Sequence, residues 1–361
     1  MPNPNAIVGL VTGIDPAVDR PSVQTFRDRP EGVAIQIEGQ RAARLTASDR
    51  AQGQLEILIE LQRIQHPAYL EVNPDTGAIT RLLVPLVVKV AALRPSPEGA
   101  LVELEISHAR HVLRRSAPDF DELMRTLRAA EGKDTQWIVT ETDEHEIIDV
   151  RPFLGARALA LPAPRNVVLD LWNRVWSWFY GCVSQDTANA MFNMASATTC
   201  NPLTVPAPCI PFLYPDDGCW GRASEMCRLM IAAGRNPAKV WIYGNLNAKT
   251  RNNPNCQVFW GWHVAPTLCV RIKWFFVTQR QVIDPSLFTK PVSEATWKSV
   301  QGDPNAQLVD TAASVFWRGS NGSTTTDPTY AQTNQVLAQY RLALKNRSLS
   351  ALGPPPYANC P

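Results

Sequence analysis

The stretch Tyr214-Pro215-Asp216-Asp217-Gly218-Cys219-Trp220 is the most informative part of this chain, because it predicts a turn that leads directly into a helix. Proline fixes φ and glycine supplies backbone freedom, so the turn is expected before Cys219. The residues that follow have helix-forming side chains, and Gly234 is expected to end the helix. Cys219 is therefore expected at a helix N-terminus, where free N–H groups and the helix dipole lower a thiol pKa. In a chain with eight cysteines, a buried or disulfide-bonded cysteine is the alternative.

A thiolate nucleophile needs a base within hydrogen-bonding reach, and a histidine commonly serves as that base. Only His263 lies in the half of the chain that contains the cysteines. It stands in the aromatic and β-branched run Val258–Ala265, which predicts a buried strand. His263 is thus the candidate base, and a core histidine with satisfied hydrogen bonds is the alternative. The histidines His108, His111 and His145 of the first half are expected to be exposed.

A third candidate follows downstream, where residues 275–283 predict a hairpin that ends at Asp284-Pro285-Ser286. An aspartate at the end of an apolar strand can orient an imidazole, although an aspartate before proline also begins ordinary turns. A cysteine at a helix start, a histidine on a strand and an aspartate on the next strand follow the logic of papain-like and transglutaminase-like cysteine enzymes.

These residues also carry a family resemblance. Residues 200–288 resemble the bacterial protein-glutamine glutaminases, which deamidate glutamine side chains in intact proteins. The matching blocks occur in one order, and they are Cys200 to Cys209, Pro211 to Trp220, Tyr243-Gly244-Asn245-Leu246, Trp262-His263-Val264-Ala265 and Ile283 to Phe288. By this resemblance Cys219 is the nucleophile, His263 is the general base and acid, and Asp284 is the orienting carboxylate.

The resemblance implies further features of the site. Trp220 and Trp262 are expected to contact the substrate, and Cys200 and Cys209, which flank a proline-rich loop, are expected to form a disulfide. Ser224 stands where the family pattern has a histidine, which leaves the three catalytic candidates unchanged. Pro237 stands where the family has a cysteine, which puts one family disulfide in doubt. With Cys219 kept as a thiol, seven cysteines remain, so at least one more is expected to be unpaired.

Length and composition indicate two domains. The chain has 361 residues, of which 45% are hydrophobic, and about 150 residues per domain suggests two. Residues 1–166 contain no cysteine, with 23 acidic and 19 basic side chains, whereas residues 167–361 contain all eight cysteines, with 10 acidic and 16 basic side chains. We expect an α+β protein with an N-terminal β-rich pro-domain at 1–152, a proline-containing linker at 153–166 and a papain/transglutaminase-like catalytic domain at 167–361. Residues 100–152 resemble the glutaminase pro-region.

Periodicity gives a coarse outline of the elements. The alternation of Leu55, Ile57, Ile59 and Leu61 predicts a strand. Residues 69–80 predict a hairpin around Asn73-Pro74-Asp75-Thr76-Gly77, and the apolar run 82–93 predicts one central strand. Asp119 is expected to cap the one clear helix of the N-terminal half. Residues 136–140 and 147–150 predict strands, and residues 167–180 predict a core helix of the catalytic domain.

Several classes of partner are not expected. No dense basic run favours nucleic acid, and no segment approaches the roughly 18 apolar residues that span a bilayer. No Cys-x-x-Cys pair is present, so neither a metal nor another cofactor is expected. The first residues show no signal peptide, yet eight cysteines indicate an oxidising destination, so export is expected.

The expected reaction is acyl transfer from a glutamine side chain to water through a thioester at Cys219. Papain-like proteases and transglutaminases share the thioester step, and a catalytically dead interaction module is a further alternative. A protease would create new N-termini and a transglutaminase would join chains, whereas a deamidase would do neither. The expected partners are proteins or peptides with glutamine and a protease that activates a monomeric zymogen within 153–166.

Overall fold

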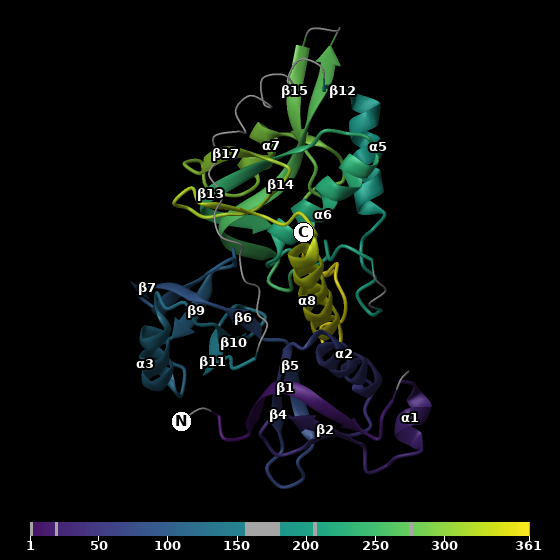
Figure 1. The fold of residues 1–361 in the computed structure, drawn as a ribbon, viewed down its shortest axis with the longest axis vertical. Helices are drawn as coiled ribbons and strands as arrows, with labels where there is room; N and C mark the ends of the chain where they lie inside the picture. Colours follow the sequence, from purple (N-terminus) through teal and green to yellow (C-terminus); the bar gives the residue numbers. More distant parts are fainter. Residues whose placement is uncertain (1–2, 19–20, 156–180, 205–207, 274–276, 361) are drawn as a thin grey trace. The chain divides into compact units, whose positions relative to one another are not determined.

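A computed structural model describes residues 3–18, 21–155, 181–204, 208–273 and 277–360 (Figure 1). The chain forms two compact units that do not follow its two halves. Unit 1 comprises Met1–Glu105, Arg110–Ala160 and Leu342–Pro354, and unit 2 comprises Ile106–Ala109, Leu161–Arg341 and Pro355–Pro361. Helices and mostly antiparallel sheets occur in both units, so the fold is α+β, as predicted. Most of the expected linker and the expected helix 167–180 lie outside the described residues.

Unit 1 has a five-stranded sheet of order β3-β2-β1-β4-β5, in which each described pairing is antiparallel. The short helix α1 (Val23–Arg27) follows β1. The predicted hairpin at residues 69–80 is formed by the last two strands. The strand bounds are β1 (Ala6–Asp15), β2 (Val33–Ile37), β3 (Ala43–Leu45), β4 (Pro67–Val72) and β5 (Ile79–Leu83).

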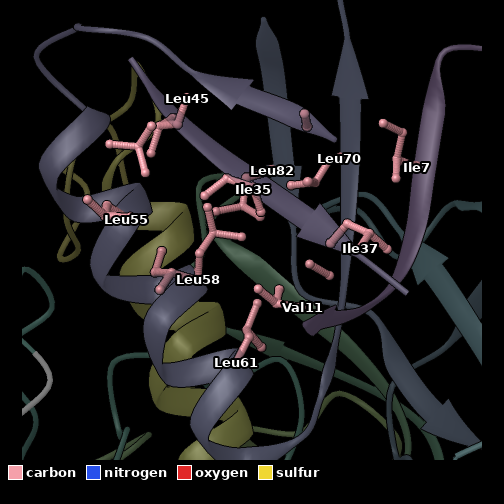
Figure 2. Packing of buried hydrophobic residues seen from close by; sticks show 14 of the residues in the cluster. Ile7, Val11, Ile35, Ile37, Leu45, Leu55, Leu58, Leu61, Leu70 and Leu82 are labelled. Carbon is pink, nitrogen blue, oxygen red and sulfur yellow. The ribbon is translucent and has the colours of Figure 1, made fainter. Parts of the chain in front are cut away.

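The strand predicted around Leu55 is a helix, α2 (Ala51–Ile64), so the prediction of a single clear helix in this half was wrong. Leu55, Leu58 and Leu61 recur every three residues and point at the sheet, where they pack with residues such as Ile35 and Leu70 (Figure 2). The alternation of apolar residues fits a strand as well as a helix over so few positions. The helix prevails because strong helix formers flank the run and 14 residues bury one apolar face.

The apolar run 82–93 also differs from its prediction, because Pro85 interrupts it. Proline has no N–H for a ladder, so β5 ends before it and two shorter strands follow. β6 (Leu86–Val88) pairs with β10 (Trp137–Glu141), which pairs with β11 (Ile147–Pro152). β7 (Val90–Ser96), β8 (Gly99–Leu104) and β9 (His111–Arg114) form a separate sheet beside the predicted helix α3 (Phe120–Ala130).

Part of the last helix, α8 (Ala331–Ser348), belongs to unit 1, although it lies near the end of the chain. Leu342 joins the apolar core beside α2, and Lys345 forms an ion pair with Glu56. Arg347 Nε lies 3.0 Å from Asp143 Oδ1. The N-terminal region therefore completes its core with residues from the C-terminal end of the chain.

Unit 2 is built on a sheet of order β16-β15-β14-β13-β17, to which β12 adds a parallel pairing with β14. Helices α5 (Gln185–Ser196) and α6 (Cys219–Ala232) pack beside β14 (Figure 1). Helix α7 (Glu294–Ser299) contacts β15 and β16, and β18 (Val315–Arg318) and β19 (Thr324–Thr326) form a hairpin. The strands are β12 (Val183–Ser184), β13 (Ala238–Lys249), β14 (Gln257–Lys273), β15 (Val277–Val282), β16 (Val292–Ser293) and β17 (Gln307–Ala312).

Each face of the unit 2 sheet packs against one apolar cluster. Leu268 and Val270 pack with α5 and α6, whereas Val240 and Ile242 pack with Trp297 of α7. Alternate side chains of a strand point to opposite faces, so a sheet covered on both faces carries long apolar runs. This arrangement holds β14 rigidly between the helix that begins at Cys219 and the segment that contains Asp284.

Three disulfides join Cys182 to Cys269, Cys200 to Cys209, and Cys256 to Cys360. Cys219 and Cys227 are free thiols, and both are buried. Across the described residues, no helix is long and apolar enough to cross a bilayer.

Candidate active site

The site begins where the turn meets α6. The helix starts at Cys219, and Gly218 precedes it with φ 81°, which a glycine adopts without strain. A Cβ at Gly218 would also collide with the ring of Tyr340. Arg222, one turn into the helix, donates from Nη1 to the carbonyl oxygens of Tyr214 at 2.9 Å and Asp217 at 2.5 Å. The turn is thus held in one conformation, and the cysteine is presented at the helix start that the sequence predicts.

His263 and Asp284 are brought together by the sheet. His263 lies within β14, and Asp284 follows the end of β15 by two residues. His263 Nε2 donates to Asp284 Oδ2 at 2.9 Å, and the same oxygen accepts a 2.9 Å hydrogen bond from Trp297 Nε1. These contacts place the proton of a neutral His263 on Nε2, because a carboxylate only accepts.

The other nitrogen of His263 is available to the thiol. A ring nitrogen of His263 and Cys219 Sγ lie within 4.8 Å of each other. His263 Nδ1 is buried and has no hydrogen-bond partner among the described residues. The ring itself is stacked against Trp260, with centroids 4.5 Å apart, and against Trp297 at 5.4 Å. Cys219, His263 and Asp284 therefore form one buried group in the order that the sequence predicts.

The charges of the group differ from the sequence expectation at one position. Burial raises the pKa of the Cys219 thiol well above its usual value, although Arg222 opposes this. The sequence predicts a lowered thiol pKa at the helix start, whereas in this form the loss of solvent around the buried sulfur is the largest effect and raises that pKa. Burial likewise lowers the pKa of His263. Burial pushes the pKa of Asp284 upward, but attraction to His263 and two hydrogen bonds keep it below its ordinary value.

A segment from the first half of the chain lies in this site. Residues Ile106–Ala109 belong to unit 2, although their neighbours in sequence belong to unit 1. Gly261 N donates to His108 O at 2.9 Å, and Ala109 forms an antiparallel bridge with Trp260. The segment therefore adds to β14 as an extended peptide does when it pairs with a strand edge.

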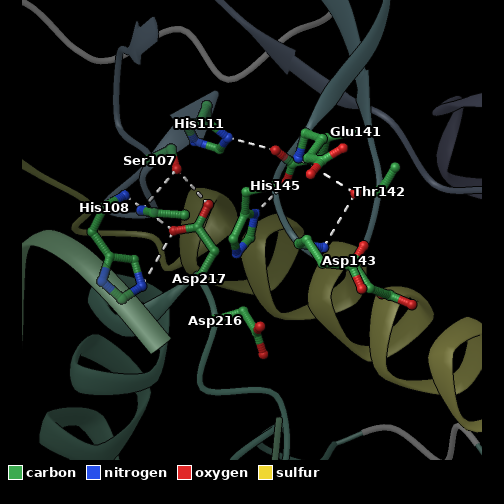
Figure 3. A network of polar contacts seen from close by, with 12 residues as sticks. Ser107, His108, His111, Glu141, Thr142, Asp143, His145, Asp216 and Asp217 are labelled. Atoms are coloured by element: carbon green, nitrogen blue, oxygen red, sulfur yellow. Dashed lines mark hydrogen bonds and ion pairs between the residues drawn. The ribbon is translucent and has the colours of Figure 1, made fainter. Parts of the chain in front are cut away.

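Asp217 holds this segment through both of its carboxylate oxygens. Ser107 Oγ donates to Asp217 Oδ2 at 2.7 Å, and His108 N donates to Asp217 Oδ1 at 3.1 Å (Figure 3). Tyr340 OH also donates to Oδ2, at 2.6 Å. The turn that presents Cys219 thus also supplies the anchor of the segment.

The side chain of His108 reaches the predicted catalytic residues. Its Nδ1 donates to Trp262 O at 3.0 Å, and its Nε2 lies 3.3 Å from Asp217 Oδ1. Its ring centroid lies 5.7 Å from that of His263 and 5.2 Å from that of Trp260. The sequence does not predict a role for His108, because its partners lie more than one hundred positions away and no local pattern indicates them.

The prediction that the histidines of the first half are exposed was wrong. His108, His111 and His145 have exposed fractions of 1%, 1% and 9%. Nδ1 of His111 and Nδ1 of His145 each contact a different oxygen of Glu141, at 2.5 Å and 2.8 Å (Figure 3). A buried histidine is tolerated when its polar atoms find partners, and here His108 and His111 find them far along the chain, whereas His145 finds Glu141 four positions away.

The two tryptophans predicted to contact substrate lie at the site. Trp220 is buried next to Cys219, and Trp262 is partly exposed. Their ring centroids are 5.8 Å apart. The ring of His108 lies 6.1 Å from Trp220 and 5.3 Å from Trp262. His108 therefore occupies the space next to both rings.

Comparisons with known proteins point to one family. A family model described as Glutaminase matches residues 188–301, which include Cys219, His263 and Asp284. The crystal structure of a pro-protein-glutaminase is 23% identical, with a TM-score of 0.54, and the match covers 76% of this chain and 97% of that one. The A47Q2 mutant of a pro-protein-glutaminase is also 23% identical, with a TM-score of 0.53, and the match covers 72% and 94%.

A further protein-glutaminase is similar over a shorter range. The protein-glutaminase from Chryseobacterium proteolyticum, solved by NMR, is 33% identical over 45% of this chain and 89% of that one, with a TM-score of 0.40. No curated protein matches the chain. The family match lies on the segment that carries the candidate site, and the pro-form structures share the fold across most of the chain. Because this chain covers 89% of a protein-glutaminase that is 33% identical to it, the chain belongs to the protein-glutaminase family of deamidating enzymes.

Proposed function

We propose that this protein is the inactive precursor of an enzyme that hydrolyses glutamine side chains of proteins to glutamate and ammonia. The observation that carries the proposal is the buried group of Cys219, His263 and Asp284. In it a carboxylate orients the imidazole through a 2.9 Å hydrogen bond, and a ring nitrogen of His263 lies within 4.8 Å of the thiol sulfur. Family membership supports deamidation over proteolysis or crosslinking.

In the proposed first step, Cys219 loses its proton to His263 Nδ1 and attacks the carboxamide carbon of glutamine. The resulting imidazolium is stabilised by Asp284, which also maintains the ring orientation. The oxyanion accepts hydrogen bonds from backbone N–H groups near the start of α6, including that of Cys219, which has no partner within the helix. His263 then protonates the departing ammonia, and a thioester remains on Cys219.

In the second step, His263 takes a proton from water, and the resulting hydroxide attacks the thioester. The C–S bond breaks, glutamate is released, and the proton returns to the sulfur. Trp220 and Trp262 are proposed to form the walls for the substrate side chain. This assignment is supported by their position next to Cys219 and by the ring contacts that His108 makes with both.

The same contacts support a zymogen. A glutamine side chain cannot approach Cys219 while the Ile106–Ala109 segment pairs with β14 and His108 fills the space beside the tryptophans. We propose that residues 1–152 are the pro-domain, 153–166 the linker and 167–361 the catalytic domain. A protease that cuts within 153–166 would begin activation.

A single cut is not expected to complete activation. Leu342 packs in the core of unit 1, and Lys345 and Arg347 form ion pairs with Glu56 and Asp143 there. These contacts are independent of the linker, so the cut pro-domain would remain bound until it is degraded. We further propose a monomeric protein secreted into an oxidising compartment, where the three disulfides persist.

The test is incubation of a glutamine-containing protein with the precursor before and after limited proteolysis. We expect ammonia release after proteolysis, together with the intact-mass change of a carboxamide converted to a carboxylate. Fragments of the substrate would instead indicate a protease, and joined chains a transglutaminase. No change in the substrate would indicate an interaction module, and equal rates before and after proteolysis would contradict the zymogen.

A further inference from the structure

The loop of residues 250–256, between β13 and β14, contacts the turn that presents Cys219. Asn253 in this loop donates from Nδ2 to Asp216 Oδ1 at 2.5 Å, across 37 positions of sequence. Asn253 and Asp216 are buried, with exposed fractions of 4% and 0%. A buried carboxylate needs hydrogen-bond donors, so the amide of Asn253 helps to determine where the side chain of Asp216 lies.

Asp216 connects the nucleophile with the base. Its backbone oxygen accepts a 3.0 Å hydrogen bond from Trp260 Nε1. Trp260 in turn stacks on the ring of His263, with centroids 4.5 Å apart. Cys219 follows Asp216 by three residues and begins α6. A displacement of Asp216 would therefore move the sulfur and the backbone N–H groups of the helix start relative to the imidazole.

The amide of Asn253 has one orientation that satisfies its neighbours. Its Oδ1 accepts a 2.7 Å hydrogen bond from Asn255 N, and its Nδ2 faces the carboxylate of Asp216. A rotated amide would direct oxygen at the carboxylate and NH₂ at the backbone N–H, so both hydrogen bonds would be lost. The backbone oxygen of Asn253 accepts from Cys256 N at 2.9 Å. Asn253 thus joins a tight loop to the turn before Cys219.

The C-terminal tail fastens the same loop. Cys256, the last residue of the loop, forms a disulfide with Cys360, which lies 104 positions later. Tyr357 N also donates to Arg251 O at 2.7 Å. Cys360 is buried, whereas Cys256 is partly exposed, so a reductant can approach the disulfide from that side. A cross-link between such distant positions limits the conformations of both segments, and its loss would loosen the loop.

We propose that Asn253 positions the catalytic turn through Asp216, and that the Cys256–Cys360 disulfide holds Asn253 in that position. This inference rests on the proposed function, since it concerns the turn that carries the nucleophile. In a reducing compartment a dithiol would transfer two electrons and two protons to the disulfide, which would leave two thiols on the chain and a disulfide on the reductant. The loop would then lose its tie to the tail, and turnover would fall. The enzyme would therefore reach full activity only where disulfides persist.

The first test exchanges the donor and the acceptor in the protease-activated enzyme. Asn253→Asp places two carboxylates face to face, and kcat should fall by about 10²-fold, because a misplacement of about 1 Å can cost that much. KM should change by less than about twofold, since the tryptophans beside Cys219 are untouched. Combining Asn253→Asp with Asp216→Asn again pairs an amide with a carboxylate, and kcat should return to within about fivefold of the wild-type value.

The second test removes the disulfide. Cys256→Ser combined with Cys360→Ser should lower kcat by about tenfold, a smaller loss than that of Asn253→Asp because the amide itself is retained. The matched control is Cys182→Ser with Cys269→Ser, which removes the disulfide near the other end of β14 and should leave kcat unchanged. Circular dichroism verifies that each variant is folded.

A readout without substrate separates this proposal from the proposed function. Iodoacetamide alkylates Cys219 faster when a base lies within reach of the thiol, and a Cys227→Ala background excludes the other free thiol of the described chain. Asn253→Asp should slow this alkylation, and the exchange with Asp216→Asn should restore its rate. If the wild-type enzyme does not deamidate but these rates change as expected, the proposed function fails and the positioning role stands.

Three results would overturn the proposal. A wild-type kcat and a wild-type alkylation rate in Asn253→Asp would show that the turn keeps its place without this amide. A loss that the exchange does not restore would show that the substitution damages the fold in general. Equal kcat values in the two disulfide variants would show that the tail does not hold the loop.

Discussion

The molecule contains two buried clusters of histidine and carboxylate. They differ in whether a reactive side chain lies beside the imidazole that the carboxylate binds. In unit 2, His263 donates from Nε2 to Asp284, and a nitrogen of its ring lies within 4.8 Å of Cys219 Sγ. In unit 1, His111 and His145 both direct Nδ1 at Glu141. The first cluster combines an oriented base with a nucleophile, whereas the second has no such group. A buried histidine–carboxylate pair therefore indicates catalysis only when the second ring nitrogen meets a reactive atom.

The largest expected effect is that of removing the nucleophile. Cys219→Ala should lower ammonia release by the activated enzyme by at least about 10⁴-fold, because no other group can form the thioester. Cys227→Ala is the matched control, since Cys227 is the other buried free thiol of the described chain. It should retain most of the activity. Equal losses in both variants would show that the cysteines act through packing.

Asp284→Asn should have the next largest effect. The amide can hold the wrong tautomer of His263, so kcat should fall by about 10³- to 10⁴-fold while the fold is retained. Glu141→Gln makes the same change in the unit 1 cluster, and it should leave the rate of the activated enzyme unchanged. The comparison between the two clusters fails if turnover survives the first substitution or is lost with the second.

His66, a buried histidine that lies outside both clusters, should make the precursor acid-sensitive. Its Nε2 donates to Pro85 O at 2.7 Å, and burial lowers its pKa to about 4. The unfolded chain binds the proton at about pH 6.5, so folding stability should fall as the pH drops from 6.5 towards 4, by about 3 kcal/mol in total. Denaturant titrations of unit 1 unfolding across this range measure the loss. His66→Gln should reduce that slope, and an unchanged slope would assign it to other groups.

Glu141→Gln should have a smaller effect on stability. Burial raises the pKa of Glu141, but attraction to His111 and His145 and their hydrogen bonds hold it below its ordinary value. The neutral amide loses the charged acceptor and turns one donor toward an imidazole, which should cost about 2 kcal/mol of folding free energy. Thermal unfolding of the precursor measures this loss. A cluster that contributes only packing would leave the transition unchanged.

Elements with strong local signals were predicted well. The start of α6 at Cys219, the strand around His263, the hairpin at residues 69–80 and helix α3 follow from turn residues, periodicity and capping within a few positions. Helix α2 was mistaken for a strand because four alternating apolar residues satisfy both periods. The interruption of the run 82–93 depended on a single proline.

The candidate catalytic residues could be predicted from the sequence because each lies in a recognisable local element: a turn before a helix, a strand, or the end of a strand. The family resemblance then assigned all three to one site. No local sequence pattern of this kind surrounds His108. Its burial and its contacts depend on Asp217 and Trp262, which are 109 and 154 positions away. The expectation that it is exposed failed because a polar side chain is placed by the partners that the fold brings to it, and its neighbours in sequence do not reveal them.

The class of chemistry and the local elements follow from the amino-acid sequence alone, since side-chain type, φ preference and periodicity act over a few residues. Three contacts depend on the tertiary fold: His263 Nε2 with Asp284, the Ile106–Ala109 segment with β14, and Leu342 with the core of unit 1. These contacts join residues far apart in the chain. Their free energy comes from desolvation and from polar pairs that form only when all the partners are packed together.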